Sequence, residues 1–289
     1  MSPMNNRLLV PQKLPLLLDY APGAAAAFSL RSLSNSYVGP VVTVRRSTDS
    51  AERDFTATEV SDGTLAAWCG GGDGFVKTWH DQSGKQNDMT APSAEQPQLI
   101  SSGVITSQGG INGLLFSAGK RLQAVAGSDF AYGTGRFFLS AVAYSNAPTE
   151  RYQHIWGQTA SGHNYFVFYY KPVLTTDTKV SFTAAASGGG SGSEVVTTPD
   201  GTVFANEWFT ASVYRNSGYL VSAIINGAPL ASATNGLNLT NTTYKPTIGG
   251  ISHAAVNNFR GYIAEVVLYS DIESQVLADR ITADQMWYY

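Results

Sequence analysis

The chain has a single cysteine, Cys69, so no disulfide bond can form within it. One thiol in 289 residues favours synthesis in a reducing compartment. Charged residues are also scarce, at 13% of the chain, where about a quarter is usual for soluble domains. The formal net charge is −3, and the densest basic cluster is only Arg45, Arg46 and Arg53. Because nucleic-acid binding depends on clustered positive charge, we expect no nucleic-acid partner.

Long hydrophobic runs are missing as well. The apolar run at residues 14–18 is interrupted by Pro15 and closed by Asp19, which makes it too short for a signal-peptide core or a membrane span. We therefore expect neither an export signal nor membrane insertion. Three prolines in residues 1–18 predict an extended arm. The arm either packs on its own domain or on a partner, such as a second copy in a homo-oligomer, or it forms the first strand of the domain.

Glycine and aromatic residues are plentiful, with 29 Gly, 15 Tyr and 13 Phe. Apolar residues make up 43% of the chain, which is enough for a sizeable core and excludes a disordered protein. Many short strands joined by tight turns have this composition, whereas a helical bundle would carry more Glu, Lys, Leu and Ala. The sequence therefore predicts an all-β fold, an antiparallel sandwich or jelly roll with a few short helices.

Strand patterns recur along most of the chain. The clearest hairpin has strands at residues 208–215 and 219–225, joined by Asn216, Ser217 and Gly218, of which Asn and Gly tolerate positive φ. Further strands are predicted, at residues 41–45, 75–79, 137–144, 152–156, 165–170, 179–184, 194–198 and 262–269. No alternation of strands and helices appears, which argues against a parallel sheet.

Three helices are expected. Four alanines and two leucines favour a helix over residues 24–33, Thr64 is a candidate N-cap for residues 64–69, and a helix over residues 274–287 closes the chain. We expect residues 19–289 to form one domain, in which block 19–96 packs on a sandwich made by residues 97–289. The glycine- and serine-rich residues 187–193 are expected to be a loop within the sandwich.

Alternation within the predicted strands identifies core positions. The expected members are apolar residues of the hairpin and of the last strand, Trp208, Phe209, Val213, Val221, Ile225, Ile263 and Val266. Trp208 and Phe209 are neighbours and cannot face the same side of the sheet.

Carboxylates are the first candidates for chemistry, because glycoside hydrolysis uses two of them across a sugar cleft. Those considered are Asp73, Asp81, Asp88, Glu207 and Glu265, and no short motif pairs any two. Glu265 lies mid-strand on the side opposite the apolar set, where a solvated glutamate is expected.

Other motifs are weaker. The glycine run at residues 70–74 lacks the Lys-Ser or Lys-Thr of a phosphate loop and predicts a tight turn. The four histidines, His80, His154, His163 and His253, have no metal-ligand spacing, although His80 and Asp81 are adjacent and suggest a polar pair. No cofactor motif occurs, but oxygen-rich loops at residues 81–84 and 87–88 are able to supply ligands for calcium.

Aromatic residues alternate through residues 165–170. Tyr165 and Tyr169 share one face of this strand with Val167, and Phe166, Phe168 and Tyr170 share the other. One face must belong to the core. The other is a sugar platform, a subunit interface or a second buried face.

Two blocks carry a family resemblance. Residues 24–54 and residues 72–88, which include Asp81-Gln82-Ser83-Gly84, resemble the start of the fungal α-L-arabinofuranosidase B catalytic domain. The same blocks resemble those of bacteriophage virion proteins, in which they precede a concanavalin A-like, laminin G-like sandwich. Residues 259–270 and the helix after them are similar to the end of those sandwiches. The resemblance implies a concanavalin A-like β-sandwich.

Departures from the arabinofuranosidase family favour the phage interpretation. The family's adjacent cysteine pair is absent here, and no segment matches its catalytic motifs. The shared Asp81–Gly84 element is then expected to be a structural turn. The sequence thus favours a non-enzymatic virion component, a capsid decoration protein, head fibre or tail appendage that contacts other virion proteins or a cell-surface glycan. The alternatives are an arabinofuranosidase-like glycoside hydrolase and a free carbohydrate-binding module. Candidate ligand-binding residues are Asp73, Trp79, Asp81, Tyr165 and Tyr169.

Overall fold

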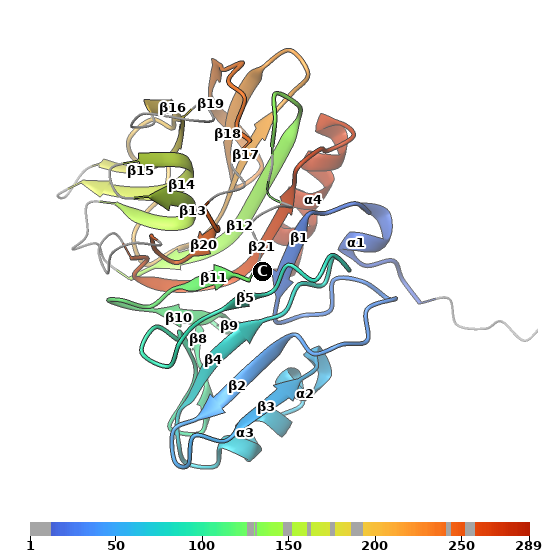
Figure 1. Cartoon of the computed structure of the whole chain (residues 1–289), viewed down its shortest axis with the longest axis vertical. Helices are drawn as coiled ribbons and strands as arrows, with labels where there is room; N and C mark the ends of the chain where they lie inside the picture. The colour runs from blue at the N-terminus through green and yellow to red at the C-terminus, as the bar shows by residue number, and fades with distance from the viewer. Residues whose placement is uncertain are drawn as a thin grey trace, which may run out of the picture.

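The computed structural model describes residues 13–125, 130, 132–146, 152–160, 163–173, 177–185, 193–240, 244–251 and 258–289. Antiparallel strands dominate this part of the chain, and four helices accompany them, the longest at the C-terminus (Figure 1). The predicted all-β fold class is confirmed. The predicted loop at residues 187–193 and His253 lie essentially outside the described residues.

The helices are α1 (Leu17–Tyr20), α2 (Ala57–Ser61), α3 (Thr64–Cys69) and α4 (Gln275–Tyr288). The strands of the first half are β1 (Ala26–Ser29), β2 (Val42–Arg46), β3 (Glu52–Phe55), β4 (Gly74–Trp79), β5 (Met89–Thr90), β6 (Gln98–Ser101), β7 (Val104–Ile105), β8 (Ser107–Gln108), β9 (Ile111–Asn112), β10 (Leu114–Phe116) and β11 (Leu122–Ala124). Those of the second half are β12 (Phe137–Ser145), β13 (Gln153–Ala160), β14 (His163–Val173), β15 (Asp177–Ala184), β16 (Ser193–Thr197), β17 (Trp208–Arg215), β18 (Leu220–Ile225), β19 (Ala228–Thr234), β20 (Thr247–Ile248) and β21 (Gly261–Tyr269).

Two sheets form the sandwich. In one, β1 and β10 pair with β21, and the order continues through β12, β17, β18 and β19. In the other, β5, β11, β20, β13, β14, β15 and β16 pair in that order. Every one of these pairings is antiparallel, so each sheet has the hydrogen-bond pattern that the sequence predicted.

The N-terminal block is hydrogen-bonded to both sheets. Strand β4 pairs with β2, which pairs with β3, and together they form the small sheet at the bottom of Figure 1. The same strand β4 also pairs with β5 of one sheet and with β6, which in turn pairs with β10 of the other. The block is therefore tied by backbone hydrogen bonds to both layers of the sandwich.

The core lies between the two sheets, and a second apolar cluster lies outside one of them. Strand β12 is buried at all nine of its residues, because its inner side chains face the core and its outer ones face this second cluster. The outer cluster includes Leu17 and Leu18 of α1, Phe138 of β12, and Ala278 and Ile281 of α4. Helix α4 begins after Ser274, whose hydroxyl accepts a hydrogen bond from the Leu277 N–H, as expected of a helix N-cap.

The predicted helix over residues 24–33 is wrong. Residues 26–29 form β1, and all four of them are fully buried. Phe28 faces the core between the sheets, and Ala27 faces the outer cluster. The small alanine side chains let β1 lie between the two apolar layers, so tertiary packing overrides the helix propensity of the alanine run.

The predicted arm ends earlier than the prolines suggested. Residues 1–12 are outside the described part of the chain, and Leu14 is 81% exposed. Leu17 and Leu18 lie instead in the one-turn helix α1 and pack on the protein's own outer cluster. The predicted role of the arm in contacts with a partner stays a prediction.

Six of the seven predicted core residues are buried. Phe209, Val213, Val221, Ile225, Ile263 and Val266 belong to the cluster between the sheets. Trp208 is half-buried and faces the other way, where it packs against Tyr144 and Tyr262. Strict alternation along β17 therefore separates Trp208 from Phe209, as predicted.

Truncating one of these core residues tests the packing. We expect Val266→Ala to lower the free energy of unfolding by about 1–3 kcal/mol, because its fully buried side chain would leave a cavity. The exposed Val276→Ala, in which 68% of the side chain is accessible, is the matched control and should change stability little. Urea denaturation of both variants measures the difference, and equal stabilities would place Val266 outside the core.

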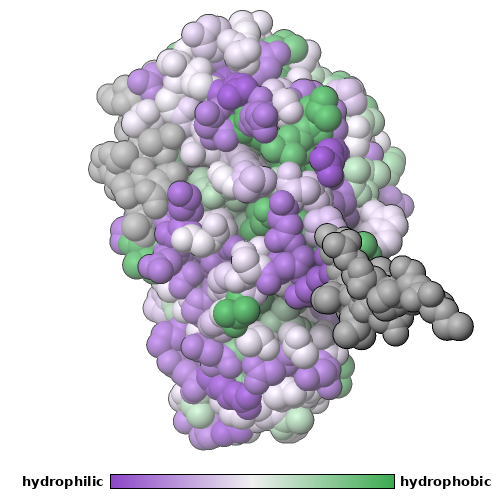
Figure 2. Space-filling model, turned by 90° about the vertical axis from the view of Figure 1, so that its right-hand side faces the viewer, coloured by the Kyte–Doolittle hydropathy of each residue, from purple (hydrophilic) through white to green (hydrophobic). Residues whose placement is uncertain are grey.

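Most of the remaining apolar side chains are inside the molecule. Figure 2 shows a face on which hydrophilic side chains predominate and apolar areas are limited. None of the helices in the described part of the chain combines the length and the apolar character that crossing a membrane requires.

Candidate functional site

A polar face with aromatic side chains lies on the outside of the β13–β16 sheet. On β14, Phe168 and Tyr170 belong to the core, so Tyr169 between them faces the opposite side. The register places Tyr169 opposite Ser181 of β15, and Ser181 opposite Thr197 of β16. Side chains from three adjacent strands therefore meet on one surface, which we call the Tyr169 face.

Glu194 is the carboxylate of the Tyr169 face. The Tyr169 hydroxyl donates a hydrogen bond of 2.8 Å to its Oε1, and the Thr197 hydroxyl donates one of 3.3 Å to its Oε2. The Thr183 hydroxyl in turn donates to the Tyr169 oxygen at 3.2 Å. Glu194 is exposed, while Tyr169 beneath it is only 5% exposed. The sheet thus presents an accessible carboxylate, and a hydroxyl donor holds each of its two oxygens in place.

Two further rings border Tyr169. The Tyr152 ring meets it edge-on, with centroids 5.5 Å apart, and the His154 ring lies 5.6 Å away at a tilt. Burial, reinforced by the hydrogen bond to Glu194, raises the pKa of the Tyr169 hydroxyl above its ordinary value. The hydroxyl therefore remains a proton donor to Glu194 throughout the neutral and mildly alkaline range.

Aromatic rings beside an oriented carboxylate suit a sugar. The C–H groups of a sugar ring pack on aromatic faces, and its hydroxyls bind carboxylate and hydroxyl oxygens. An exposed, ionised carboxylate is also the group that attacks or deprotonates at a glycosidic bond.

Of the residues that the sequence singled out, two lie on the strand that carries this face. Tyr169 is at its centre, and Tyr165 is on the same strand β14, although its side chain is outside the described part of the structure. The prediction that both bind a ligand stays a prediction.

Trp79 and Asp73 lie elsewhere. Trp79 is fully buried in the core at the end of β4, against Phe28. Asp73 orders a turn, because its backbone N–H donates to the Ser47 hydroxyl and its Oδ1 accepts from the Ser102 N–H. These contacts place both side chains in the N-terminal block and not on the β13–β16 sheet that carries the Tyr169 face.

Asp81 is the centre of a buried turn. One carboxylate oxygen accepts from the backbone N–H groups of Ala27 and Ser83, and the other accepts from the Ser83 hydroxyl and the Asn87 N–H. Burial raises the pKa of the Asp81 carboxyl, and these hydrogen bonds act in the opposite direction. With four donors around it, Asp81 organises residues 81–87, as the sequence predicted for a structural turn. No group of three or more metal-binding side chains is gathered anywhere in the described residues.

His80 pairs with Asp88 and not with its neighbour Asp81. Its Nδ1 lies 2.9 Å from Asp88 Oδ2, and its Nε2 lies 2.8 Å from the Thr43 hydroxyl. Burial would raise the pKa of Asp88, but the hydrogen bonds from His80 and from the Asp81 N–H outweigh it and lower that pKa. The predicted His80–Asp81 pair is therefore wrong, because the Asp81 oxygens are bound by Ala27, Ser83 and Asn87.

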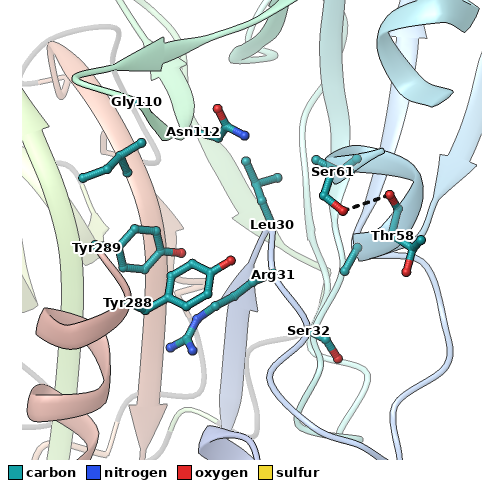
Figure 3. Close-up of a pocket in the computed structure, with 12 residues that line it drawn as sticks. Leu30, Arg31, Ser32, Thr58, Ser61, Gly110, Asn112, Tyr288 and Tyr289 are labelled. Atoms are coloured by element: carbon teal, nitrogen blue, oxygen red, sulfur yellow. Dashed lines mark hydrogen bonds between the residues drawn. The ribbon is translucent and has the colours of Figure 1, made fainter. Parts of the chain in front are cut away.

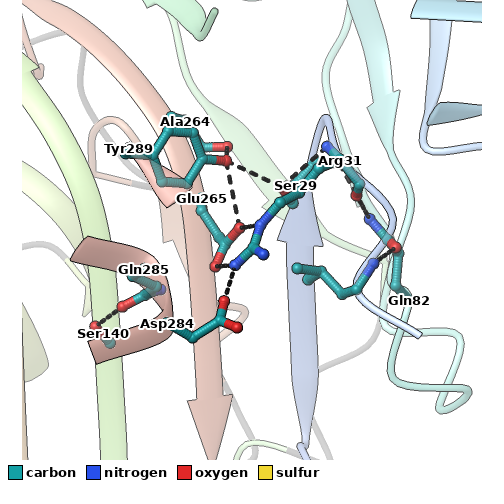
Figure 4. Close-up of polar contacts among 10 residues, drawn as sticks. Ser29, Arg31, Gln82, Ser140, Ala264, Glu265, Asp284, Gln285 and Tyr289 are labelled. Atoms are coloured by element: carbon teal, nitrogen blue, oxygen red, sulfur yellow. Dashed lines mark hydrogen bonds and ion pairs between the residues drawn. The ribbon is translucent and has the colours of Figure 1, made fainter. Parts of the chain in front are cut away.

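Glu265 is buried, which corrects the expectation of a solvated side chain. It is fully inaccessible and forms a two-pronged ion pair with Arg31, with Nε–Oε2 and Nη2–Oε1 distances of 2.8 and 3.1 Å (Figure 4). Arg31 also binds Asp284 of α4, and the Tyr289 hydroxyl lies 3.3 Å from Glu265. With both oxygens occupied and no access, Glu265 joins β1, β21 and α4 and is not a candidate for catalysis.

Sequence reasoning missed Glu194, His154 and Tyr152 as members of one site. The strand that begins at Glu194 was predicted, and the only further signal was a glutamate beside a strand rich in aromatic residues. The contact between Glu194 and Tyr169 depends on the β14–β15–β16 register, which the sequence does not reveal.

Comparisons with known proteins identify the family. A model of the catalytic domain of α-L-arabinofuranosidase B matches residues 19–166, about half of the chain. The chain belongs to this family. No curated protein sequence matches it.

Solved structures agree at the level of the fold. An arabinofuranosidase complexed with arabinofuranosyl-α-1,2-xylobiose is 16% identical to this chain, with a TM-score of 0.63. The match covers 93% of this chain and 64% of that enzyme. A family 54 α-L-arabinofuranosidase with a glutamate-to-glutamine mutation, soaked with 4-nitrophenyl α-L-arabinofuranoside, matches with the same identity and coverage and a TM-score of 0.62. A third, soaked with a cyclic sulfate inhibitor, is 18% identical with a TM-score of 0.59. The chain thus spans about 64% of the length of these enzymes.

These findings overturn the phage interpretation. The family match assigns residues 19–166 to an arabinofuranosidase catalytic domain, and the similar structures are arabinofuranosidases. The predictions of a virion component and of a location on the particle are wrong, whereas the expected partners stay a prediction. The absence of the adjacent cysteine pair gave too much weight to the phage resemblance.

Proposed function

We propose that the chain is a glycoside hydrolase that acts on α-L-arabinofuranosides, with the sugar on the Tyr169 face and Glu194 as the reacting carboxylate. The observation that carries this proposal is the oriented, accessible Glu194 beside the Tyr152 and Tyr169 rings. Family membership supplies the class of substrate.

The geometry suits Glu194 to attack the anomeric carbon of the sugar. The Tyr169 hydroxyl donates to the attacking carboxylate and stabilises its charge again in the second step, in which water attacks the anomeric carbon, the bond to Glu194 breaks and the sugar is released. The bond to the leaving group breaks in the first step, and its oxygen takes a proton from a general acid.

Sugar binding without turnover is the second candidate function. Hydrolysis needs a second carboxyl group, about 5–5.5 Å from the first in retaining enzymes. Within the described residues, the hydrogen-bond network of the Tyr169 face contains one carboxylate, Glu194. An oriented carboxylate with hydroxyl and aromatic neighbours also suits sugar binding alone, so this candidate is tested beside hydrolysis. The glycan partner and the homo-oligomer expected from the sequence stay predictions in either case.

A hydrolysis assay with a stacking variant tests the site. We expect release of 4-nitrophenol from 4-nitrophenyl α-L-arabinofuranoside, and we expect Tyr152→Ala to raise KM about tenfold because one side of the platform is lost. The control is Tyr219→Ala, at a 42% exposed tyrosine in the β17–β18 turn, which should match the unmodified chain.

The outcomes separate the two candidates. Binding of the arabinoside that Tyr152→Ala weakens, without nitrophenol release, would favour the binding protein. If the two tyrosine variants behave alike, the sugar does not lie on the Tyr169 face and the proposed site is wrong.

A further inference from the structure

A cavity lies apart from the Tyr169 face, where Tyr288 and Tyr289 meet the N-terminal block. Its volume is about 460 Å³, within the range of roughly 300–1,000 Å³ that small-molecule sites occupy. Its walls come from the segment that follows β1, from α2, from β9 and from Tyr288 and Tyr289. None of these elements belongs to the β13–β16 sheet that carries the Tyr169 face.

The walls combine aromatic, hydroxyl and apolar groups. Tyr288 and Tyr289 stand on one side, and Thr58 and Ser61 of α2 stand on the opposite side, with Leu30 and Asn112 between them (Figure 3). Tyr288 is half exposed, and the two tyrosine rings meet edge-on with centroids 4.9 Å apart. A ligand in this cavity therefore meets an aromatic edge on one side and hydroxyl groups on the other.

Arg31 fixes the tyrosine wall and leaves little positive charge for a ligand. Its guanidinium lies 4.3 Å from the Tyr288 ring centroid and is paired with Glu265 and Asp284. The two carboxylates occupy the Arg31 cation, whose side chain is only 8% exposed. An anionic ligand would therefore have to compete with Glu265 and Asp284 for the Arg31 guanidinium.

The geometry points to this cavity as a binding site for a short neutral saccharide, separate from the Tyr169 face. Aromatic and apolar groups accommodate the C–H face of a sugar ring, and Ser32, Thr58, Ser61 and Asn112 supply uncharged hydrogen-bonding groups. The site needs no hydrolysis and holds a portion of a neutral polysaccharide against the protein surface.

Titration with xylotetraose tests the site, because this neutral probe carries no arabinofuranoside to be cleaved. We expect it to bind the full chain, and we expect Ser61→Trp, which fills the cavity, to weaken binding at least about tenfold. Tyr288→Ala should weaken binding as well. Ser217→Trp, at an exposed serine in the β17–β18 turn, is the matched control and should bind like the unmodified chain. Tetragalacturonate, an anionic probe of the same length, should bind at least about tenfold more weakly at low salt.

Failure of this inference is distinguishable from failure of the proposed function. Nitrophenol release is measured on the same variants and should not change in Ser61→Trp. Absence of xylotetraose binding to the unmodified chain would overturn the inference, as would equal binding by Ser61→Trp or tighter binding of tetragalacturonate.

Discussion

Replacing Glu194 by glutamine should lower kcat for arabinofuranoside hydrolysis by about a thousandfold or more, with KM little changed. The glutamine keeps the shape of the side chain and one oxygen for the Tyr169 hydroxyl, so the strand register and the aromatic platform remain. It removes the negative charge that attacks the anomeric carbon. The measurement is the initial rate of nitrophenol release as a function of substrate concentration.

The matched control for this variant is Glu207→Gln. Glu207 is also an exposed glutamate close to the start of a strand, and it lies immediately before β17. It should keep the full rate. A Glu194→Gln protein that turns over as fast as Glu207→Gln would show that Glu194 takes no part in the chemistry.

The largest expected loss of stability follows the replacement of Asp81. Its two oxygens accept four hydrogen bonds, three of them from backbone N–H groups. In Asp81→Asn an amide nitrogen would face two of these donors, which leaves them unpaired in a 3% exposed site. We expect the free energy of unfolding to fall by about 3–5 kcal/mol.

Urea denaturation measures this loss, with Asp62→Asn as the control. Asp62 is an exposed aspartate whose carboxylate accepts a hydrogen bond from the N–H of Thr64, its near neighbour in sequence. Its replacement should barely move the midpoint. Equal midpoints for the two variants would mean that the Asp81 turn does not hold the N-terminal block to the sandwich.

The strands and helices that the sequence predicted correctly are those that short stretches of neighbouring residues specify. The β17–β18 hairpin needs only alternation and a turn with Asn216 and Gly218, and α4 needs only a helical segment with Ser274 as its cap. The alanine-rich residues of β1 were mistaken for a helix, since their conformation is set by β21 and two apolar layers that are distant in sequence.

The candidate site was predictable only in part for the same reason. Alternation on β14 identified Tyr169, and turn chemistry identified the Asp81 element. Glu194 meets Tyr169 through two strand pairings, and Glu265 meets Arg31 across 234 positions of the chain. Such meetings depend on tertiary packing, which a single sequence does not specify.

The most direct test of the account is a crystal structure of the Glu194→Gln protein soaked with 4-nitrophenyl α-L-arabinofuranoside. The account predicts the arabinofuranosyl ring against Tyr152, over the buried Tyr169, with its anomeric carbon about 3–3.5 Å from the substituted side chain at position 194. A sugar bound away from these rings, or an empty Tyr169 face at saturating glycoside, would contradict it.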